Sequence, residues 1–295
     1  MQELKEKERR AIEVLKAFEP EDGYHLCYSG GKDSDCIRIL ADLAGVKHEI
    51  HHNLTTADAP ETVYYVKSIP NVIIDKPEIS MWRLIERQGY PPTRLARYCC
   101  EKLKEHGGAG RLKITGVRKK ESRNRKENGG LVKILGKGAS VRKSAQEIGA
   151  KTEETKKGGI VLNMDDDPSR RLVEQCYRTT STMVNPIIDW SEDDVWDFLK
   201  AYGCKSNPLY ACGRKRVGCI GCPVATVKNQ REDFRQYPKY YAMYVAAFDR
   251  MLKTRRAKGL TERPDIHWTD GEAVMRWWLG EDETQILWED IGLEV

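Results

Sequence analysis

Apolar residues recur at two spacings in the first part of the chain, and the two spacings alternate. Helical spacing over residues 2–18 predicts an amphipathic helix that ends at Pro20. Short apolar runs then predict strands, and each run is followed by a segment with helical spacing. The predicted strands are 24–28, 48–53 and 71–76, and the predicted helices between them are 34–45 and 59–69.

The alternation continues through a helix at 79–89, a strand at 111–117 and a helix at 190–203. Because strands that alternate with helices pair in parallel, the predicted fold is α/β and Rossmann-like: a mostly parallel sheet of about five strands with helices on both faces. Three further boundaries follow from the pattern. This α/β domain is predicted to span residues 1–225. Within it, an insertion over about 124–175 interrupts the alternation of strands and helices, and a helical C-terminal region is predicted over 226–295.

Composition narrows the class of protein. The chain has 295 residues, of which 40% are hydrophobic, and a formal charge of +5. No apolar run approaches the length of a membrane span, and the first ten residues are too charged for a signal peptide, so we expect a cytoplasmic protein without a membrane partner. Disulfides are rare in that compartment, and the nine cysteines are an odd number. They therefore favour metal binding or redox chemistry.

Basic residues concentrate between Arg111 and Lys143. This segment, 111–143, holds twelve lysines and arginines but only two acidic residues, Glu121 and Glu127. Such a run predicts an anionic partner, with nucleic acid as one candidate. The alternative is a solvated, partly disordered loop, because glycine-rich and charged stretches often have no other role.

The stretch S-G-G-K-D-S, residues 29–34, lies between the first predicted strand and the next helix. Glycines let the backbone N–H groups converge there, and the helix N-terminus adds a partial positive charge, so the loop is suited to bind phosphate. The hydroxyls of Ser29 and Ser34 and the Lys32 ammonium would add contacts. Asp33 beside an anion is explained if a Mg²⁺ ion shares the site. The Walker pattern is not met, because Asp33 follows the lysine and no first glycine stands at the required offset.

This six-residue run after a first strand resembles the PP-loop of the ATP-pyrophosphatase superfamily, which adenylylates substrates and releases pyrophosphate. In that interpretation Cys27 and Cys36, which flank the loop, are small core residues and not a redox pair.

Two cysteine pairs stand apart from this loop: Cys99-Cys100 in "RYCCEKLK", and Cys219 with Cys222 in "VGCIGCP". Adjacent cysteines do not readily place both sulfurs on one tetrahedral zinc ion, whereas an iron–sulfur cubane offers a separate iron to each thiolate. We therefore favour a four-cysteine [4Fe-4S] cluster, with a zinc site and unligated cysteines as the alternatives.

Together the two features resemble the phosphoadenosine phosphosulfate (PAPS) reductase family, in its iron–sulfur adenylyl-sulfate reductase branch. The stretches "ITGVRKKESRNR" and "NPLYACGRKRVGCIGCP" support the likeness, which covers about residues 20–225. The resemblance implies an adenine nucleotide alpha hydrolase fold and a [4Fe-4S] cluster. It also implies nucleotide contacts from Ser29, Gly30, Gly31, Lys32, Asp33, Ser34, Gly116, Arg118 and Arg123, with Lys32, Asp33 and Arg118 as the catalytic candidates.

One departure from that family affects the expected reaction. The reductases carry a nucleophilic cysteine in a C-terminal Glu-Cys-Gly-Leu-His segment, and this sequence has no cysteine after Cys222. The four cysteines and PP-loop also resemble the ATP-pyrophosphatase component of DNA phosphorothioation systems. That likeness implies ATP with Mg²⁺ as the nucleotide, and adenylylation that drives sulfur transfer, with nucleic acid among the acceptors.

Two other functions remain open. In the first, adenylyl sulfate or PAPS is reduced to sulfite, and a cysteine such as Cys176 replaces the missing nucleophile. In the second, the chain is a non-enzymatic, cluster-bearing subunit that binds nucleic acid. The partners expected across these readings are an adenine nucleotide, a sulfur-donor protein such as a cysteine desulfurase, thioredoxin, and a second copy of the chain.

Overall fold

The computed structural model describes residues 2–105, 107–136, 138–156, 158–260 and 268–281. The chain divides into two compact units. The sheet unit comprises Met1–Asn53, Pro60–Asp75 and Gly107–Val217, and the helical unit comprises Leu54–Ala59, Lys76–His106 and Gly218–Val295. The division differs from the boundary at 225 in the sequence analysis, because residues 54–59, 76–106 and 218–225 belong with the C-terminal helices.

The sheet unit contains one sheet of eight strands in the order β3-β2-β1-β4-β8-β5-β7-β6. Neighbours among the first five strands in this order are parallel, and the other pairs are antiparallel. The strands are β1 (Tyr24–Cys27), β2 (His48–Asn53), β3 (Val72–Asp75), β4 (Lys113–Ile114), β5 (Val132–Leu135), β6 (Glu153–Glu154), β7 (Ile160–Leu162) and β8 (Ser181–Val184). The expected five strands match the parallel part alone, because the insertion supplies the three additional strands β5, β6 and β7.

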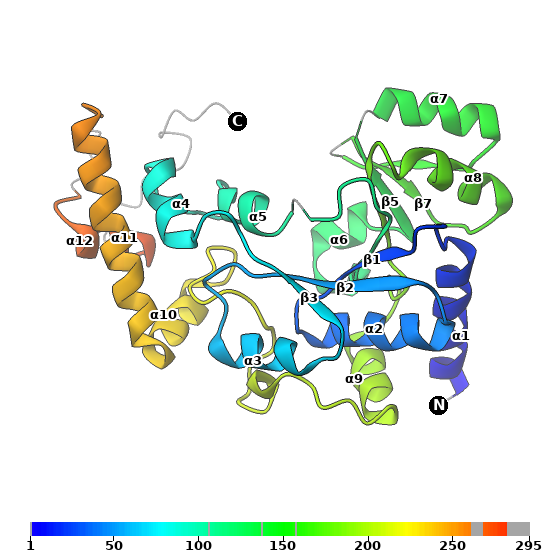
Figure 1. The fold of residues 1–295 in the computed structure, drawn as a ribbon, viewed down its shortest axis with the longest axis horizontal. Helices are drawn as coiled ribbons and strands as arrows, with labels where there is room; N and C mark the ends of the chain where they lie inside the picture. Colours follow the sequence, from blue (N-terminus) through cyan, green and yellow to red (C-terminus); the bar gives the residue numbers. More distant parts are fainter. Residues whose placement is uncertain (1, 106, 137, 157, 261–267, 282–295) are drawn as a thin grey trace. The chain divides into compact units, whose positions relative to one another are not determined.

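Helices pack around this sheet (Figure 1). The helices α1, α2 and α9 pack together, as do α7 and α8 of the insertion. Their apolar positions form one core with the strands, which includes Leu15, Leu26, Ile37 and Phe198. The helical segments of the unit are α1 (Gln2–Ala17), α2 (Lys32–Ala44), α3 (Pro60–Ser68), α6 (Arg123–Asn128), α7 (Gly138–Ile148), α8 (Asp167–Cys176), α9 (Glu192–Ala201) and the 3₁₀ turns η1 (Lys119–Glu121) and η2 (Pro208–Tyr210).

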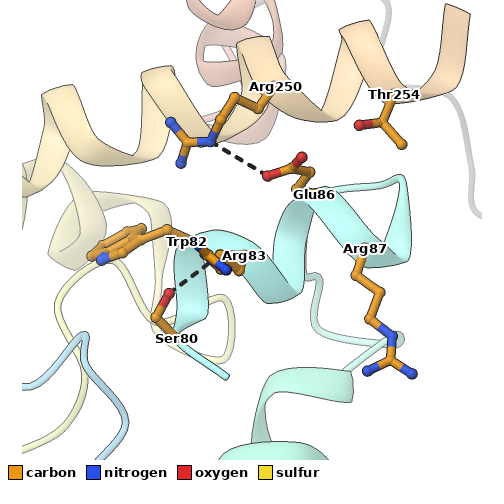
Figure 2. Close-up of a pocket in the computed structure, with 7 residues that line it drawn as sticks. All are labelled: Ser80, Trp82, Arg83, Glu86, Arg87, Arg250 and Thr254. Carbon is orange, nitrogen blue, oxygen red and sulfur yellow. Dashed lines mark hydrogen bonds and ion pairs between the residues drawn. The ribbon is translucent and has the colours of Figure 1, made fainter. Parts of the chain in front are cut away.

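The helical unit contains α4 (Met81–Gln88), α5 (Tyr98–Leu103), α10 (Val227–Gln236), α11 (Pro238–Ala257) and α12 (Gly271–Trp278). Aromatic rings form much of its core: Tyr244 lies 4.8 Å from Trp82 and 5.0 Å from Trp278 between ring centroids. Helices α4 and α11 pack side by side, and an ion pair of 3.5 Å joins Glu86 to Arg250 between them (Figure 2). No helix in the described part of the chain has the length and apolar character needed to cross a bilayer.

Candidate nucleotide site and cysteine cluster

The loop at residues 28–31 leaves the carboxyl end of β1 and enters α2, as the sequence pattern predicts. Gly30 has φ +72°, and a Cβ at this position would lie 2.8 Å from Cγ2 of Val66. Only glycine fits such a backbone and such a contact. At Gly31, a Cβ would approach the Tyr210 hydroxyl to 3.2 Å, so both glycines keep the loop close to its neighbours.

The position of this loop in the sheet is one that favours ligands. The strand order runs from β1 through β2 to β3 in one direction and from β1 through β4 to β8 in the other. Open α/β sheets bind ligands beside the carboxyl ends of the strands where the order reverses. Gly116 follows β4 at this point, and a Cβ on it would lie 2.9 Å from the Asp33 backbone. The chain after β4 therefore passes directly against the loop.

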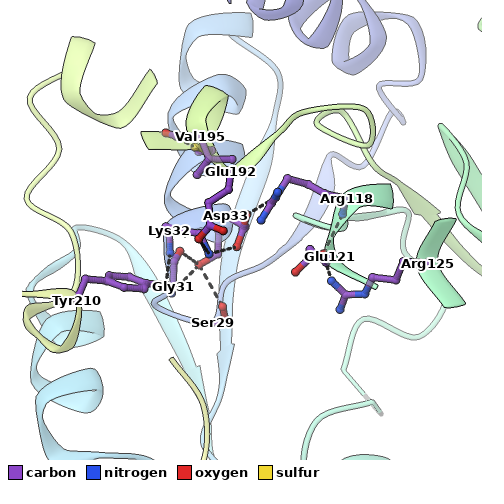
Figure 3. A network of polar contacts seen from close by, with 12 residues as sticks. Ser29, Gly31, Lys32, Asp33, Arg118, Glu121, Arg125, Glu192, Val195 and Tyr210 are labelled. Carbon is purple, nitrogen blue, oxygen red and sulfur yellow. Dashed lines mark hydrogen bonds and ion pairs between the residues drawn. The ribbon is translucent and has the colours of Figure 1, made fainter. Parts of the chain in front are cut away.

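This close approach brings Arg118 to Asp33. The Arg118 Nε donates to Asp33 Oδ1 at 2.6 Å, and Lys32 Nζ lies 3.4 Å from Asp33 Oδ2 and 3.5 Å from a carboxylate oxygen of Glu192 (Figure 3). Lys32 and Arg118 are only 4% and 3% exposed. Two buried cations thus share the Asp33 carboxylate at the mouth of the loop, and Glu192 supplies a second negative charge, so these four side chains balance one another in charge.

Two amides of the loop donate to hydroxyl groups. The Gly31 N–H donates to Ser34 Oγ at 3.1 Å, and the Lys32 N–H donates to the Tyr210 hydroxyl at 2.9 Å. Ser34 Oγ also lies 3.2 Å from Ser29 Oγ. Hydroxyl oxygens therefore accept hydrogen bonds from two amides that the sequence analysis expects to contact phosphate oxygens. Both amides are occupied within the chain, and a ligand at the Lys32 amide would have to displace Tyr210.

Two further arginines join this group, and the sequence analysis missed both. The pKa of Arg125 is lowered by burial and by the positive charges of Arg216 and Arg118, so the three guanidinium groups lie within electrostatic reach of one another. Arg125 also forms an ion pair with Glu121. Arg125 lies in the sequence "RNR" and Arg216 in "GRKR", but nothing in the spacing of these basic residues distinguishes either one from its neighbours.

Arg123, by contrast, is not brought to the loop. Its side chain is 92% exposed and pairs with Glu127, one turn along α6, at 2.9 Å. The basic segment 111–143 as a whole does not form one free surface either. Among the described residues of the segment, six basic side chains are seen to pair with carboxylates: Arg111, Arg118, Lys119, Arg123, Arg125 and Arg142.

The four cysteines of the two pairs all belong to the helical unit. Cys99 and Cys100 lie in the first turn of α5, while Cys219 and Cys222 lie in a loop before α10. Gly221 between the latter two has φ +67°, and a Cβ there would come within 2.4 Å of Phe234. The Gly221 N–H donates to Asp233 at 3.0 Å. The C-x-x-C turn is therefore held in one conformation by its surroundings.

These thiols influence one another. A hydrogen bond with Cys100, burial, and the charges of Cys219 and Cys222 raise the pKa of Cys99. The charge of Cys219, together with Asp58, raises the pKa of Lys104, which forms a hydrogen bond with that thiol. Among the described residues no three His, Cys, Asp or Glu side chains converge on a point that suits a single metal ion.

The remaining cysteines differ in exposure. Cys36 is fully buried in the core, and burial raises the pKa of Cys27 to about 11, which agrees with the expected packing roles. Cys176 is buried at the end of α8, where burial raises its pKa. A buried thiol with a raised pKa is a poor nucleophile. Cys212 is exposed.

Comparisons with curated proteins find reductases among the relatives. The chain is 23% identical over 265 residues to an uncharacterized protein of Methanocaldococcus jannaschii, a match that covers 82% of this chain and 53% of that protein. It is 35% identical over 71 residues to an adenosine 5'-phosphosulfate reductase of Staphylococcus saprophyticus, which covers 23% of this chain and 29% of the reductase. The chain thus matches about half or less of the length of these relatives.

Among solved structures, the crystal structure of phosphoadenylyl-sulfate (PAPS) reductase from Candida auris in a phosphate complex is similar with a TM-score of 0.42 and 15% identity. That match covers 74% of this chain and 95% of the reductase. The sequence model of the phosphoadenosine phosphosulfate reductase domain matches residues 23–225, which contain the loop at 29–34 and both cysteine pairs. The chain therefore belongs to the phosphoadenosine phosphosulfate reductase domain family.

Proposed function

We propose that this chain binds ATP with Mg²⁺ at the loop of residues 29–34 and uses it to adenylylate a substrate oxygen, so that sulfur can replace that oxygen. The observation that carries the proposal is the group of four cations at the loop: Lys32, Arg118, Arg125 and Arg216. Their fixed positive charges exceed those of the acidic side chains paired with them. Such a group favours a ligand that bears several negative charges over a single sulfate.

The proposed step is a displacement at the α-phosphorus of ATP. A substrate oxygen attacks that phosphorus, the bond to the β-phosphate breaks, and its electron pair leaves with pyrophosphate. Lys32 and Arg118 would stabilise the charge that develops on the departing phosphates, since both are buried next to the loop. A sulfur nucleophile from a donor protein then displaces AMP, which carries the former substrate oxygen away.

Asp33 is the proposed Mg²⁺ ligand of this site. Carboxylates together with phosphate oxygens are the usual ligands of this ion in nucleotide enzymes. In the structure the carboxylate is paired with Arg118 and Lys32. Metal binding would therefore replace these pairs and leave both cations free to contact phosphate.

Cys99, Cys100, Cys219 and Cys222 are proposed to hold a [4Fe-4S] cluster. The thiols lie in one unit and are electrostatically coupled, and thiolates are the standard ligands of iron–sulfur clusters. A bound cluster would supply a redox or electrostatic element. The ammonium of Lys104, which forms a hydrogen bond with Cys219, would compensate part of the negative charge of the thiolates.

A second candidate function is the reduction of adenylyl sulfate or PAPS to sulfite. It is favoured by the relatives named adenosine 5'-phosphosulfate reductase. Cys176 is a weak candidate for the nucleophile of this reaction, because it is buried and its pKa is raised.

A nucleotide-binding screen on anaerobically purified protein separates these functions. We expect ATP to bind more tightly than adenylyl sulfate or PAPS, and Lys32→Ala to abolish the binding, with iron and acid-labile sulfide present in equal amounts. Preference for adenylyl sulfate, with sulfite released in the presence of thioredoxin, would establish the reductase instead. Cluster content without nucleotide binding or pyrophosphate release would favour a non-enzymatic subunit.

A further inference from the structure

The helical unit has a groove of about 640 Å³ that the nucleotide proposal does not use. It is lined by Ser80, which caps α4, by Trp82, Arg83, Glu86 and Arg87 of α4, and by Arg250 and Thr254 of α11. Figure 2 shows Arg250 of α11 paired with Glu86 of α4, with Trp82 and Arg87 toward opposite ends of α4 and the Arg87 side chain extending away from α11. All of these residues belong to the helical unit.

The charge of this groove is unbalanced. Glu86 is its only acidic residue, and it already pairs with Arg250. Arg83 and Arg87 are both exposed, and neither forms an ion pair with a described residue. Because they lie four residues apart on α4, their side chains share one helix face. Two exposed arginines on one face of α4 therefore have no ion-pair partner among the described residues.

The positive surface extends along α11. From Arg250 to Lys258 the sequence RMLKTRRAK holds five basic residues and no acidic residue. Arg255 donates to the Gly89 carbonyl at 2.8 Å and so has a structural role, whereas Lys253 and Lys258 are exposed. The spacing of these charges along a helix suits an extended polyanion better than a single small anion.

Trp82 gives the groove an aromatic surface. Its ring is half-buried, and edge contacts with Tyr240 at 6.2 Å and Tyr244 at 4.8 Å between centroids hold it in place. A fixed aromatic ring beside arginines is the combination on which single-stranded nucleic acids bind, because bases stack on the ring while guanidinium groups contact the phosphates.

We propose that this arginine groove, formed by Trp82, Arg83, Arg87 and Arg250, binds single-stranded nucleic acid. Phosphodiester groups contact Arg83 and Arg87, and a base stacks on Trp82. RNA and DNA share this chemistry. The inference does not depend on the reaction proposed at the loop of residues 29–34.

The test is fluorescence anisotropy of the full-length protein with labelled 12-nucleotide RNA and DNA strands over a range of salt concentrations. Arg83→Ala/Arg87→Ala is expected to weaken binding about tenfold at about 50 mM salt, and to reduce the slope of log K against log salt by about 1.4, since each lost phosphate contact removes about 0.7. The double variant Lys228→Ala/Lys239→Ala removes the same charge from exposed positions of the same unit, and is expected to change neither value appreciably.

Trp82→Leu separates stacking from charge. It is expected to weaken binding about fivefold or more while the salt slope stays constant, because stacking releases no counter-ions. Equal losses in the arginine and lysine double variants would overturn the proposal, as would displacement of the strand by polyglutamate as effectively as by unlabelled strand. Stronger binding of one strand type identifies RNA or DNA as the ligand. ATP binding is measured on every variant and is expected to be unchanged, so failure of the groove and failure of the nucleotide site are distinguishable.

Discussion

Arg118 and Arg123 give a sharp test of the nucleotide site. The family resemblance implies that both contact the nucleotide, whereas in the structure only Arg118 lies at the loop of residues 29–34. Arg118 is 3% exposed and donates to Asp33 beside the loop, whereas the Arg123 side chain is 92% exposed and pairs with Glu127. Arg118→Gln and Arg123→Gln each remove one positive charge and keep a polar side chain. The net charge of the protein therefore changes equally in both.

The expected magnitude follows from the contact that Arg118 would make. A hydrogen bond to a charged group contributes about 1.5–3 kcal/mol, and about 1.4 kcal/mol corresponds to a tenfold change in affinity. Arg118→Gln should therefore weaken ATP binding about 10- to 150-fold. Arg123→Gln should change it less than about twofold, since a solvated charge away from the ligand is screened by salt.

Isothermal titration calorimetry with ATP and Mg²⁺ at one salt concentration measures both variants. Arg118 also neutralises Asp33, so urea unfolding must show that the variant still folds, and Arg118→Lys, which keeps the charge, should recover part of the affinity. The reasoning is refuted if Arg123→Gln weakens binding as much as Arg118→Gln, or if Arg118→Gln binds ATP like the wild type.

Three further changes test the loop and the core. Gly30→Ala should cost about 1–3 kcal/mol of stability and most of the ATP affinity, because φ is +72° and the added Cβ would lie 2.8 Å from Val66. The control is Gly45→Ala, where φ is +66° and the added Cβ would meet nothing within 4 Å. It should leave ATP binding intact in the same titration. Burial raises the pKa of Asp35 from 3.8 to about 6. The folded state therefore binds more protons than the unfolded state, and stability falls by about 3 kcal/mol in total as pH rises from about 3 to 7. Asp35→Asn should lack that fall, so the free energy of unfolding of the wild type minus that of the variant, measured with urea, should decrease over this pH range. A difference that stays constant with pH would contradict the assignment. Tyr244→Ala should lower the free energy of unfolding by about 3–5 kcal/mol, because the ring is fully buried. Tyr244→Phe loses only the 3.1 Å hydrogen bond to the Ile220 carbonyl and should lower it by about 1 kcal/mol. Thermal unfolding measures both variants.

Local patterns were enough to predict four of the five strands of the parallel part of the sheet, but not β8. The loop at 29–34 lies between a strand and a helix as expected, because a short apolar run, two glycines and a helix-spaced segment determine that geometry locally. The strands β5, β6 and β7 were not predicted. They have two to four residues each, and they pair antiparallel in a chain of contacts in which β5 joins β8, β7 joins β5 and β6 joins β7. They lie in a glycine- and lysine-rich insertion that breaks the alternation of strands and helices, so the pattern did not mark them.

The candidate site was predicted where its residues are adjacent in the sequence. Lys32 and Asp33 follow from the loop itself, whereas Arg118 required the family resemblance. Arg216 joins the group only because the segment after α9 stays in the sheet unit and passes the loop, where the Tyr210 hydroxyl accepts from the Lys32 N–H. The spacing of arginines in 111–143 could not distinguish a buried Arg118 from an exposed Arg123. Burial, and not composition, decides which arginine can bind the ligand.

The two cysteine pairs show why the C-terminal helices are more than an appendage. Residues 76–106 leave the sheet unit after β3, and residues from Gly218 onward join them in the helical unit. Cys100 and Cys219 therefore belong to one unit although 118 residues lie between them in the sequence. The Tyr244 hydroxyl of α11 donates to the Ile220 carbonyl inside the C-x-x-C turn, and its ring packs on Trp82 of α4. The family match ends at residue 225, but the side chains that support the cysteine turn lie beyond it. A chain cut at that point would therefore keep all four thiols and lose the core that holds them.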